Sequence, residues 1–296
     1  MGEIMKILAI DLGGTTAKVA LMVKDEITKR WIVPTDVENI FQNIKDNLEG
    51  LDLSEVDRIG LSMPGFINHE TGVVKLSGNL KLKDFDAKGE FKRIFGKEVY
   101  VLNDANAAAM GEYWKGAGTD YSSIVFYTIG TGIGGGLIIN NKLVYGNNGY
   151  AGEFGHAGMM QSKFKCSCGL DNCVEPLSSA TGIEKLLSEH YGKKTTIKEM
   201  STKIAEKDPE VIKLMKEALM PLSSHMAIMQ TAINPDAIII GGGPSALGQP
   251  LIDIIAENLN TMQLPFIQKS TKLLIASTKN DAGIYGATIW AKNKGQ

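Results

Sequence analysis

The feature that most constrains the fold is a unit of apolar run, Gly/Thr turn and second apolar run, which occurs once in each half of the chain. The first turn is Asp11-Leu-Gly-Gly-Thr-Thr16, flanked by apolar runs at 4–10 and 17–23. The second is Gly130-Thr-Gly-Ile-Gly-Gly-Gly136, between apolar runs at 123–129 and 137–140. Each copy is typical of two strands joined by a glycine turn. Because the copies share little else, the chain repeats a supersecondary unit, which predicts two domains that each offer a phosphate-binding hairpin to a shared cleft.

The rest of the chain alternates between predicted strands and predicted helices. Short apolar runs predict strands at 56–62, 99–102, 237–240 and 272–276. Helical periodicity predicts helices at 104–114, 251–262 and 283–292, and a mostly helical stretch from 176 to 234. This alternation favours an α/β fold, and the polar stretch 115–120 is the predicted boundary between its halves.

Charge, hydropathy and cysteine placement exclude several classes of protein. The formal net charge of the 296 residues is −2, which argues against a protein that coats nucleic acid. No apolar run approaches the roughly 20 residues of a membrane span, and the beginning of the chain lacks the segments of a secretory signal. All three cysteines lie between Cys166 and Cys173, unlike a dispersed disulfide framework. We therefore expect a cytoplasmic protein without a nucleic-acid or membrane partner.

The glycine-rich turns are candidate phosphate-binding sites. In the first turn, backbone N–H groups and the Thr15 and Thr16 hydroxyls offer donors, and Asp11 could hold Mg²⁺ through water. The alternative is an ordinary hairpin turn. The second turn is followed by a β-branched strand rather than a helix, which argues against a Rossmann dinucleotide site. A third segment, Gly241–Gly243, follows a strand and precedes a helix, and taken alone it is typical of a tight turn.

Four side chains form a candidate zinc site. His156, Cys166, Cys168 and Cys173 supply the ligand types of a tetrahedral zinc. The alternative is three unrelated thiols and a histidine, which their concentration in one short stretch disfavours. Because four protein ligands leave no open position, such a zinc would be structural and not hydrolytic.

Three acidic side chains are candidates for the chemistry. Asp104 follows a predicted strand and begins a predicted helix, so it is either a helix N-cap or a general base aimed into the cleft. Glu153 and Glu175 bracket the candidate zinc segment and could accept hydrogen bonds from a polyhydroxylated ligand. Their alternative is that of most glutamates, a solvated surface charge.

Taken together, these motifs resemble the ROK family (repressors, open reading frames and sugar kinases). The resemblance runs from residue 6 to about 290 and rests on residues 11–16, Leu102-Asn-Asp-Ala-Asn-Ala-Ala108, Thr128–Gly135, Gly152-Glu-Phe-Gly-His156 and Cys166-Ser-Cys-Gly-Leu-Asp-Asn-Cys-Val-Glu175. It implies a two-domain ribonuclease H-like fold of the actin/hexokinase type with a cleft between domains. The small α/β domain would comprise residues 1–117 and 281–296, and the large one residues 118–280 with the zinc segment.

The resemblance also implies roles for individual residues. Asp104 would be the catalytic base. Sugar contacts would come from Gly65, Asn79, Asn103, Asp104, Glu153, His156 and Glu175. Nucleotide and Mg²⁺ contacts would come from Asp11, Gly13, Gly14, Thr15, Thr16, Lys18, Gly130, Thr131, Gly132, Gly134, Gly241, Gly242 and Gly243. The chain departs from the family pattern at Asn172, which replaces a glycine, and at Lys83, where many family glucokinases carry Trp.

The resemblance thus implies an ATP-dependent kinase that phosphorylates the 6-hydroxyl of a hexose, with ATP, Mg²⁺ and a structural Zn²⁺, and a homodimer. Glucose is the leading acceptor, and N-acetylmannosamine, fructose and β-glucosides are alternatives. The alternative of another class is a non-catalytic sugar-sensing regulator. Because only ten residues precede Asp11, we expect no helix-turn-helix ahead of the first phosphate turn.

Overall fold

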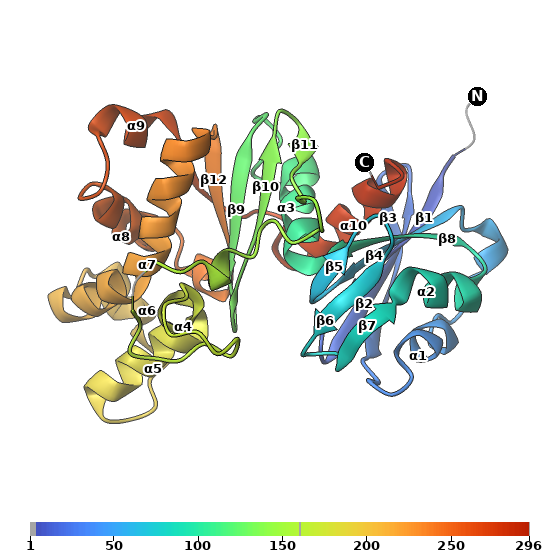
Figure 1. The fold of residues 1–296 in the computed structure, drawn as a ribbon, viewed down its shortest axis with the longest axis horizontal. Coiled ribbons are helices and arrows are strands. Elements are labelled where there is room, and N and C mark those ends of the chain that lie inside the picture. Colours follow the sequence, from blue (N-terminus) through green and yellow to red (C-terminus); the bar gives the residue numbers. More distant parts are fainter. Residues whose placement is uncertain (1–3, 160, 296) are drawn as a thin grey trace.

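The protein is built on two mixed five-stranded sheets, which lie in separate halves of the molecule (Figure 1). The computed structural model describes residues 4–159 and 161–295. The first sheet has the order β3-β2-β1-β4-β8, with β1 (Lys6–Leu12), β2 (Thr16–Val23), β3 (Glu26–Pro34), β4 (Arg58–Met63) and β8 (Glu98–Asn103). The second has the order β11-β10-β9-β12-β13, with β9 (Ile124–Ile129), β10 (Ile133–Ile139), β11 (Lys142–Leu143), β12 (Ala237–Gly242) and β13 (Lys272–Ile275).

Both sheets begin with the predicted hairpin. Strand β1 pairs antiparallel with β2 and parallel with β4, and β9 pairs antiparallel with β10 and parallel with β12. The repeated supersecondary unit is therefore confirmed. Both glycine turns are thereby placed at the same relative position on their sheets.

The first half carries elements that no sequence pattern predicted. They are β3, the three-stranded sheet of β5 (Phe66–Asn68), β6 (Val73–Ser77) and β7 (Leu82–Asp86), and the helices α1 (Ile40–Asp46) and α2 (Ala87–Phe95). These strands are short or largely exposed, so they lack the apolar run that marks a buried strand.

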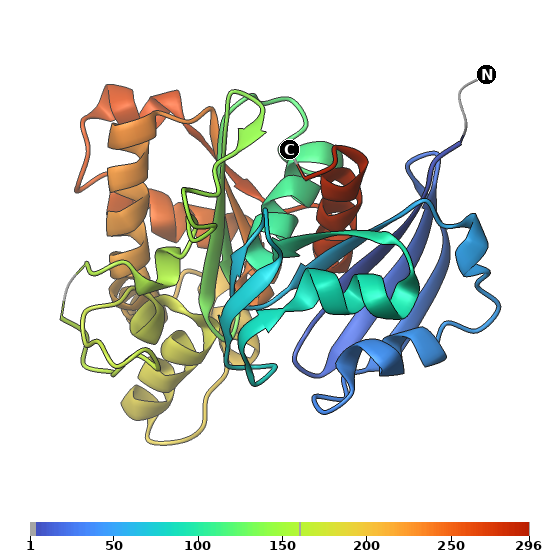
Figure 2. The ribbon, with the colours of Figure 1, turned by 45° about the vertical axis from the view of Figure 1, so that its right-hand side comes forward.

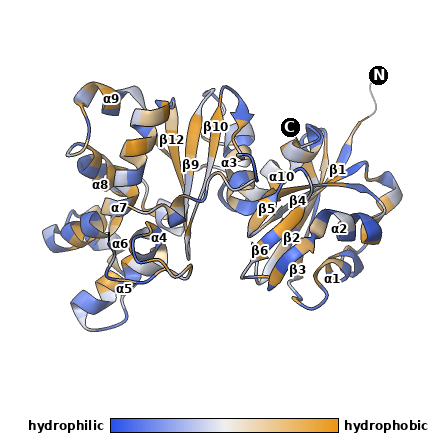
Figure 3. Ribbon diagram, viewed as in Figure 1, coloured by the Kyte–Doolittle hydropathy of each residue, from blue (hydrophilic) through white to orange (hydrophobic). Residues whose placement is uncertain are grey.

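The predicted helical stretch from 176 to 234 is present in the second half, which carries further helices after it. The helices of this half are α4 (Glu175–Ser178), α5 (Ala180–Tyr191), α6 (Ile197–Ala205), α7 (Pro209–Ile233), α8 (Gln249–Leu259) and α9 (Pro265–Ser270). The long helix α7 begins where the Asp208 carboxylate accepts the N–H groups of Glu210 and Val211, and it ends at Asn234 in the left-handed conformation. It packs with α5 and α8 on the apolar side chains of β9 and β12, whose hydrophobic character is visible in Figure 3.

Two helices join the halves. Helix α3 (Asp104–Lys115) follows β8 and leads into the second sheet, and α10 (Ala282–Lys292) returns from β13 to pack on α3 and the first sheet. Figure 2 shows α3 and α10 side by side between the two sheets. Their backbones touch, because a Cβ at Gly286 would overlap the Ala107 carbonyl. Among the described residues, no helix is both long and apolar enough to cross a membrane.

Candidate active site

Asp104 lies where β8 gives way to α3, and its neighbour supplies the helix cap. The Asn103 amide oxygen accepts the N–H groups of Ala105 and Asn106 at 2.9 and 3.1 Å. The Asn103 amide nitrogen donates to the Gly65 carbonyl at 3.0 Å. Asn103 therefore does the capping, which frees Asp104 from that role. The Asp104 carboxylate accepts the neighbouring Ala105 N–H at 2.8 Å and faces an open cavity.

This cavity, of about 230 Å³, lies at the junction of the two sheets. The first glycine turn, β9, α3 and the start of α10 all contribute to its walls. The lining residues are Asp11, Lys18, Asp104, Ala105, Ala108, Thr128, Lys279, Asn280, Ala282 and Gly283. Asp11 accepts the Ser62 hydroxyl at 3.0 Å and lies 3.7 Å from the Lys18 ammonium. The cavity thus combines two carboxylates with two lysines.

The acidic groups at this junction have raised pKa values. The Asp104 side chain is exposed to the cavity, but the protein around it limits its hydration, and this desolvation, with the charge of Asp11, raises its pKa to about 6. Burial and the charges of Asp104 and Glu175 raise the pKa of Glu153 to about 7. Burial also raises the pKa of Asp11, although Lys18 opposes it. A carboxylate with a pKa near 6 is suited to accept a proton at neutral pH.

The first glycine turn is closed by a hydrogen bond from the Gly13 N–H to the Thr16 carbonyl, at 2.9 Å. Gly14, Thr15 and Thr16 are exposed beyond it. Asn79 lies beside this turn, because a Cβ at Gly14 would be 3.3 Å from the Asn79 Cβ. The structure therefore brings Asn79 next to the first turn, while Gly65 is held by Asn103.

The second glycine turn is shorter than its sequence indicated. The Gly130 N–H bonds to the Gly132 carbonyl at 2.9 Å, and strand β10 begins already at Ile133, not at Leu137 as expected. Gly134 belongs to the strand, where the absence of a side chain leaves room for Ala105 at the start of α3. The turn therefore consists of Gly130, Thr131 and Gly132, and Thr131 is its exposed residue.

The third glycine segment lies beside the second turn. Gly241 and Gly242 pair with Thr128 and Ile129 at the end of β9. Gly242 has φ +87°, and a Cβ there would overlap the Ile129 carbonyl. Gly243 then opens the 3₁₀ turn Gly243–Leu247 that precedes α8.

Glu175 links the second turn to the candidate zinc segment. One carboxylate oxygen accepts the Ile133 N–H at 3.0 Å, and the other lies 3.9 Å from the Cys166 sulfur. A Cβ at Gly132 would overlap this carboxylate. Glu175 is therefore not a solvated surface charge.

The four predicted zinc ligands converge. Their ligand atoms all lie within 4.8 Å of one another. The His156 Nδ1 is 3.5 Å from the Cys166 sulfur, and the Cys168 and Cys173 sulfurs are 3.6 Å apart. A tetrahedral zinc with ordinary bond lengths separates its ligands by about 3.5–3.8 Å. The residues therefore fit a zinc ion, and His156 brings its Nδ1 to the cluster.

The turn that carries Glu153 and His156 contacts both halves. It forms the 3₁₀ segment Phe154–His156. The Phe66 ring of the first half stacks on the His156 ring at 6.4 Å between centroids. On its other side, Phe154 packs against Tyr127 and His225 of the second core.

Sequence reasoning missed the segment between β13 and α10. Lys279 and Asn280 line the cavity, and the Asn280 carbonyl accepts the Lys18 ammonium at 3.1 Å. Asp281 forms a two-pronged ion pair with Arg30, at 2.6 and 2.8 Å. The segment has no motif, and its position between a predicted strand and a predicted helix is the sequence signal that could have identified it.

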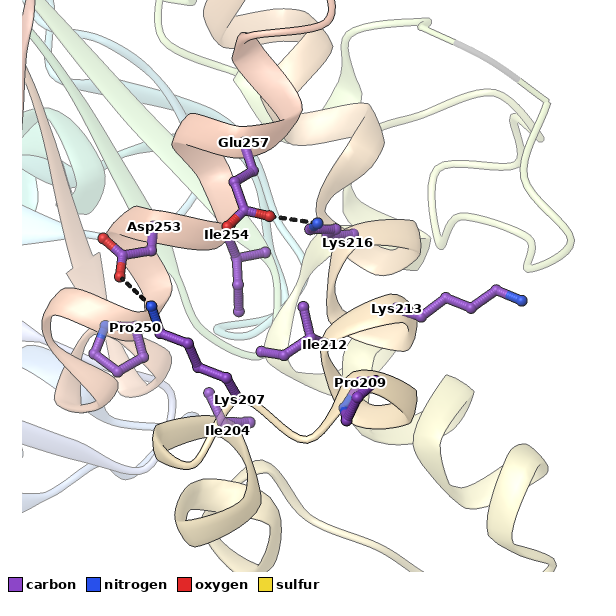
Figure 4. Close-up of a pocket in the computed structure, with 10 residues that line it drawn as sticks. All are labelled: Ile204, Lys207, Pro209, Ile212, Lys213, Lys216, Pro250, Asp253, Ile254 and Glu257. Atoms are coloured by element: carbon purple, nitrogen blue, oxygen red, sulfur yellow. Dashed lines mark ion pairs between the residues drawn. The ribbon is translucent and has the colours of Figure 1, made fainter.

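A larger cavity, of about 420 Å³, lies elsewhere, between α6, α7 and α8 (Figure 4). Its floor is aliphatic, from Ile204, Ile212 and Ile254. Ion pairs of Lys207 with Asp253 and of Lys216 with Glu257 cross its rim. It contains none of the predicted site residues, so its size does not make it the reactive centre.

The chain is similar to known proteins over nearly its whole length. Residues 7–294 match the sequence profile of the ROK family. A glucokinase of Halalkalibacterium halodurans is 34% identical, over 94% of this chain and 92% of the relative. A glucokinase of Thermotoga maritima is 30% identical, over 98% of both chains. The crystal structure of a ROK family glucokinase from Streptomyces griseus, in complex with glucose and AMPPNP, superposes with a TM-score of 0.80 at 28% identity, over 97% of this chain and 99% of that one.

Proposed function

The chain belongs to the ROK family, and we propose that it works as an ATP-dependent hexose kinase that transfers the γ-phosphoryl group to the 6-hydroxyl of glucose. The observation that carries the proposal is the position of Asp104. It faces the cavity between the two halves, close to the first glycine turn, and its pKa of about 6 suits a base at neutral pH.

In the proposed reaction, the 6-hydroxyl of the sugar gives its proton to the Asp104 carboxylate as its oxygen attacks the γ-phosphorus. The new bond joins that oxygen to phosphorus, the bond to the bridging oxygen breaks, and ADP leaves with the electron pair. Asp104 then releases the proton to solvent. The protein contributes mainly positioning and charge stabilisation, which dominate phosphoryl transfer.

The two glycine turns would hold the phosphates from opposite sides. Gly14 to Thr16 offer N–H and hydroxyl donors from the first half, Thr131 and Gly132 offer theirs from the second, and Gly13 and Gly130 close the two turns. Lys18 and Lys279 add positive charge at the same cavity. Asp11 would hold Mg²⁺ through water, and the ion would neutralise charge on the phosphates. Gly241 to Gly243 would let the adenosine approach the backbone.

The zinc would have a structural role. Held by His156, Cys166, Cys168 and Cys173, it would fix the His156 ring so that Nε2 can meet a sugar hydroxyl. Glu175 would be held at the same time, since it lies against the Cys166 sulfur and the second turn.

The sugar would be recognised through carboxylates and amides. Glu153, Glu175 and Asn103 can bond several ring hydroxyls, and a sugar that lacks one leaves a buried polar group unpaired. Sugars with an added substituent would instead be accepted or rejected by steric fit near Gly65 and Asn79. Gly65 lies against the Leu76 carbonyl, because a Cβ at Gly65 would overlap it. Leu76 in β6 pairs with Lys83 in β7, so Lys83 lies one strand away from Gly65.

A coupled ADP-release assay over a panel of sugars tests the proposal. We expect glucose, or a close hexose, to be phosphorylated with MgATP, with Asp104→Asn as the inactive control. A kcat/KM for N-acetylmannosamine at least tenfold above that for glucose would refute glucose as the acceptor but would be consistent with the proposed mechanism. If no sugar released ADP, the sensor alternative would replace the kinase.

Three expectations from the sequence stay predictions. These are the domain boundaries at 117/118 and 280/281, the homodimer and the cytoplasmic location. The family resemblance supports the first two, and limited proteolysis and analytical ultracentrifugation test them.

A further inference from the structure

Glu112 is a buried acidic residue that the proposed reaction does not use. It lies in α3, and its exposed fraction is 0%. Within the described part of the chain, no lysine, arginine or histidine forms an ion pair with it. A buried carboxylate is costly unless hydrogen bonds satisfy it, so its surroundings call for an explanation.

Both carboxylate oxygens of Glu112 accept hydrogen bonds from backbone. One accepts the N–H groups of Ala117 and Ser277, at 2.9 and 3.0 Å. The other accepts the Thr278 N–H at 2.8 Å and also the Thr278 hydroxyl. Hydrogen bonds to an ionised acceptor are about twice as strong as neutral ones. The buried charge is thus held by four donors instead of a cation.

The donors belong to the two crossings, which are the segments where the chain passes from one sheet to the other. Ala117 follows α3 on the way to β9, and Ser277 and Thr278 follow β13 on the way to α10. The Glu112 carbonyl also accepts the N–H groups of Gly116 and Gly118, at 3.0 and 2.9 Å. One residue therefore joins both crossings.

The second crossing leads directly into the cavity wall. Thr278 precedes Lys279 and Asn280, and Asn280 accepts the Lys18 ammonium of the first half. The helices on either side are in backbone contact, because a Cβ at Gly111 would overlap the Ala282 carbonyl. A shift of Thr278 would thus move cavity residues relative to Asp104.

We propose that Glu112 is a positioning residue that fixes the two crossings, which together form the hinge between the halves. By holding both crossings on one carboxylate, it sets the orientation in which Asp104 and the first glycine turn face the second glycine turn. Its effect on phosphoryl transfer rests on the proposed kinase function. Its effect on the hinge does not.

Glu112→Gln tests this with almost no change in shape. In either orientation, the amide NH₂ faces N–H donors that the carboxylate accepted, so at least one crossing loses its bond. We expect hydrogen exchange to rise at least about tenfold at residue 278, or at residues 117 and 277, depending on which oxygen the NH₂ group replaces, with no change in strand 237–240. We also expect kcat to fall about 10²-fold, the cost of a misplacement of roughly 1 Å far from the chemistry.

Thr278 provides a milder pair of variants should Glu112→Gln fail to fold. Thr278→Val keeps the shape and removes only the hydroxyl bond, whereas Thr278→Ser keeps the hydroxyl. The Val variant should show faster exchange at residues 277 and 278 and a lower kcat, and the Ser variant should match the wild type. Equal behaviour of the two would overturn the proposal.

Asn258→Ala is the control for simple loss of stability. Asn258 is 3% exposed and bonds to the Lys216 carbonyl within the second half. Its variant should lower the Tm but keep kcat at temperatures well below the Tm. Unchanged exchange at the crossings of Glu112→Gln, or a kcat loss no larger than that of Asn258→Ala at a similar Tm, would refute the hinge. If the wild type phosphorylates no sugar, the kinase fails, while the exchange data still decide the hinge.

Discussion

Replacing Asp104 with Asn is expected to lower turnover by about 10²–10⁴-fold, the usual contribution of a positioned proton acceptor. This corresponds to about 3–5 kcal/mol of transition-state stabilisation. The amide has the shape of the carboxylate and can still accept the Ala105 N–H, so the helix start should be preserved. Sugar affinity should change far less than turnover, which separates loss of a base from loss of the fold.

The pH dependence of the wild type gives an independent measure of the same group. Only the ionised carboxylate can accept the proton, so activity is lost as the pH falls through the pKa. With a pKa of about 6, the ionised fraction falls from about 97% at pH 7.5 to about 24% at pH 5.5, and kcat/KM falls about fourfold. An ordinary aspartate, with a pKa near 3.9, would lose only a few per cent over this range.

Protonation of Glu153 could also produce a loss of activity between pH 7.5 and pH 5.5. Its pKa of about 7 would produce a fall of about 25-fold over the same range if Glu153 had to be ionised. Glu153→Gln removes that group and should keep the inflection near pH 6. Near-normal turnover in purified Asp104→Asn, or a flat profile down to pH 5.5 in Glu153→Gln, would remove Asp104 from the role of base.

Three further predictions concern the metal, the second turn and the cavity rim. Protein purified without added metal should hold one zinc per chain by elemental analysis, and Cys168→Ser should lose zinc and sugar binding but keep ATP binding; full activity without zinc would contradict this. Gly132→Ala should lower kcat/KM for ATP about tenfold, because its Cβ would overlap the Glu175 carboxylate, whereas Gly78→Ala, which has open space, should match the wild type in the same assay. Lys279→Gln should raise the KM for ATP severalfold and leave the KM for sugar unchanged, since a phosphate contact loses its charge; an unchanged KM for ATP would exclude that contact.

The parts of the site that could be predicted from sequence are those made by neighbours along the chain. The zinc ligands Cys166, Cys168 and Cys173 lie within eight residues, and their ligand atoms do converge with that of His156. The glycine turns are equally local, because each is closed by one hydrogen bond within the turn. Such features need no knowledge of how distant segments pack.

The parts that could not be predicted depend on packing between distant segments. A glutamate inside a helix is usually solvated, and the return of residues 277–278 to α3 supplies donors that help make Glu112 a buried acceptor. Lys279 enters the cavity for the same reason. Strand β3 was missed because most of its side chains are exposed at the edge of the sheet, so it carries no apolar alternation.

The position of α10 between the halves has a consequence for the order in which the chain can fold. Ile284, Ala287 and Ala291 of α10 pack on Ile7 and Ala9 of β1, so one face of the first sheet is covered only when residues separated by most of the chain have met. During synthesis, β1 to β8 emerge long before α10, so one face of the first sheet stays uncovered until α10 has been made. The second half is inserted between β8 and α10 of the first half, and its core can form before α10 covers the first sheet. Docking of α10 should therefore be among the last events of folding. Its residue Trp290, which is completely buried, would report this step by fluorescence in a variant that lacks Trp31 and Trp114.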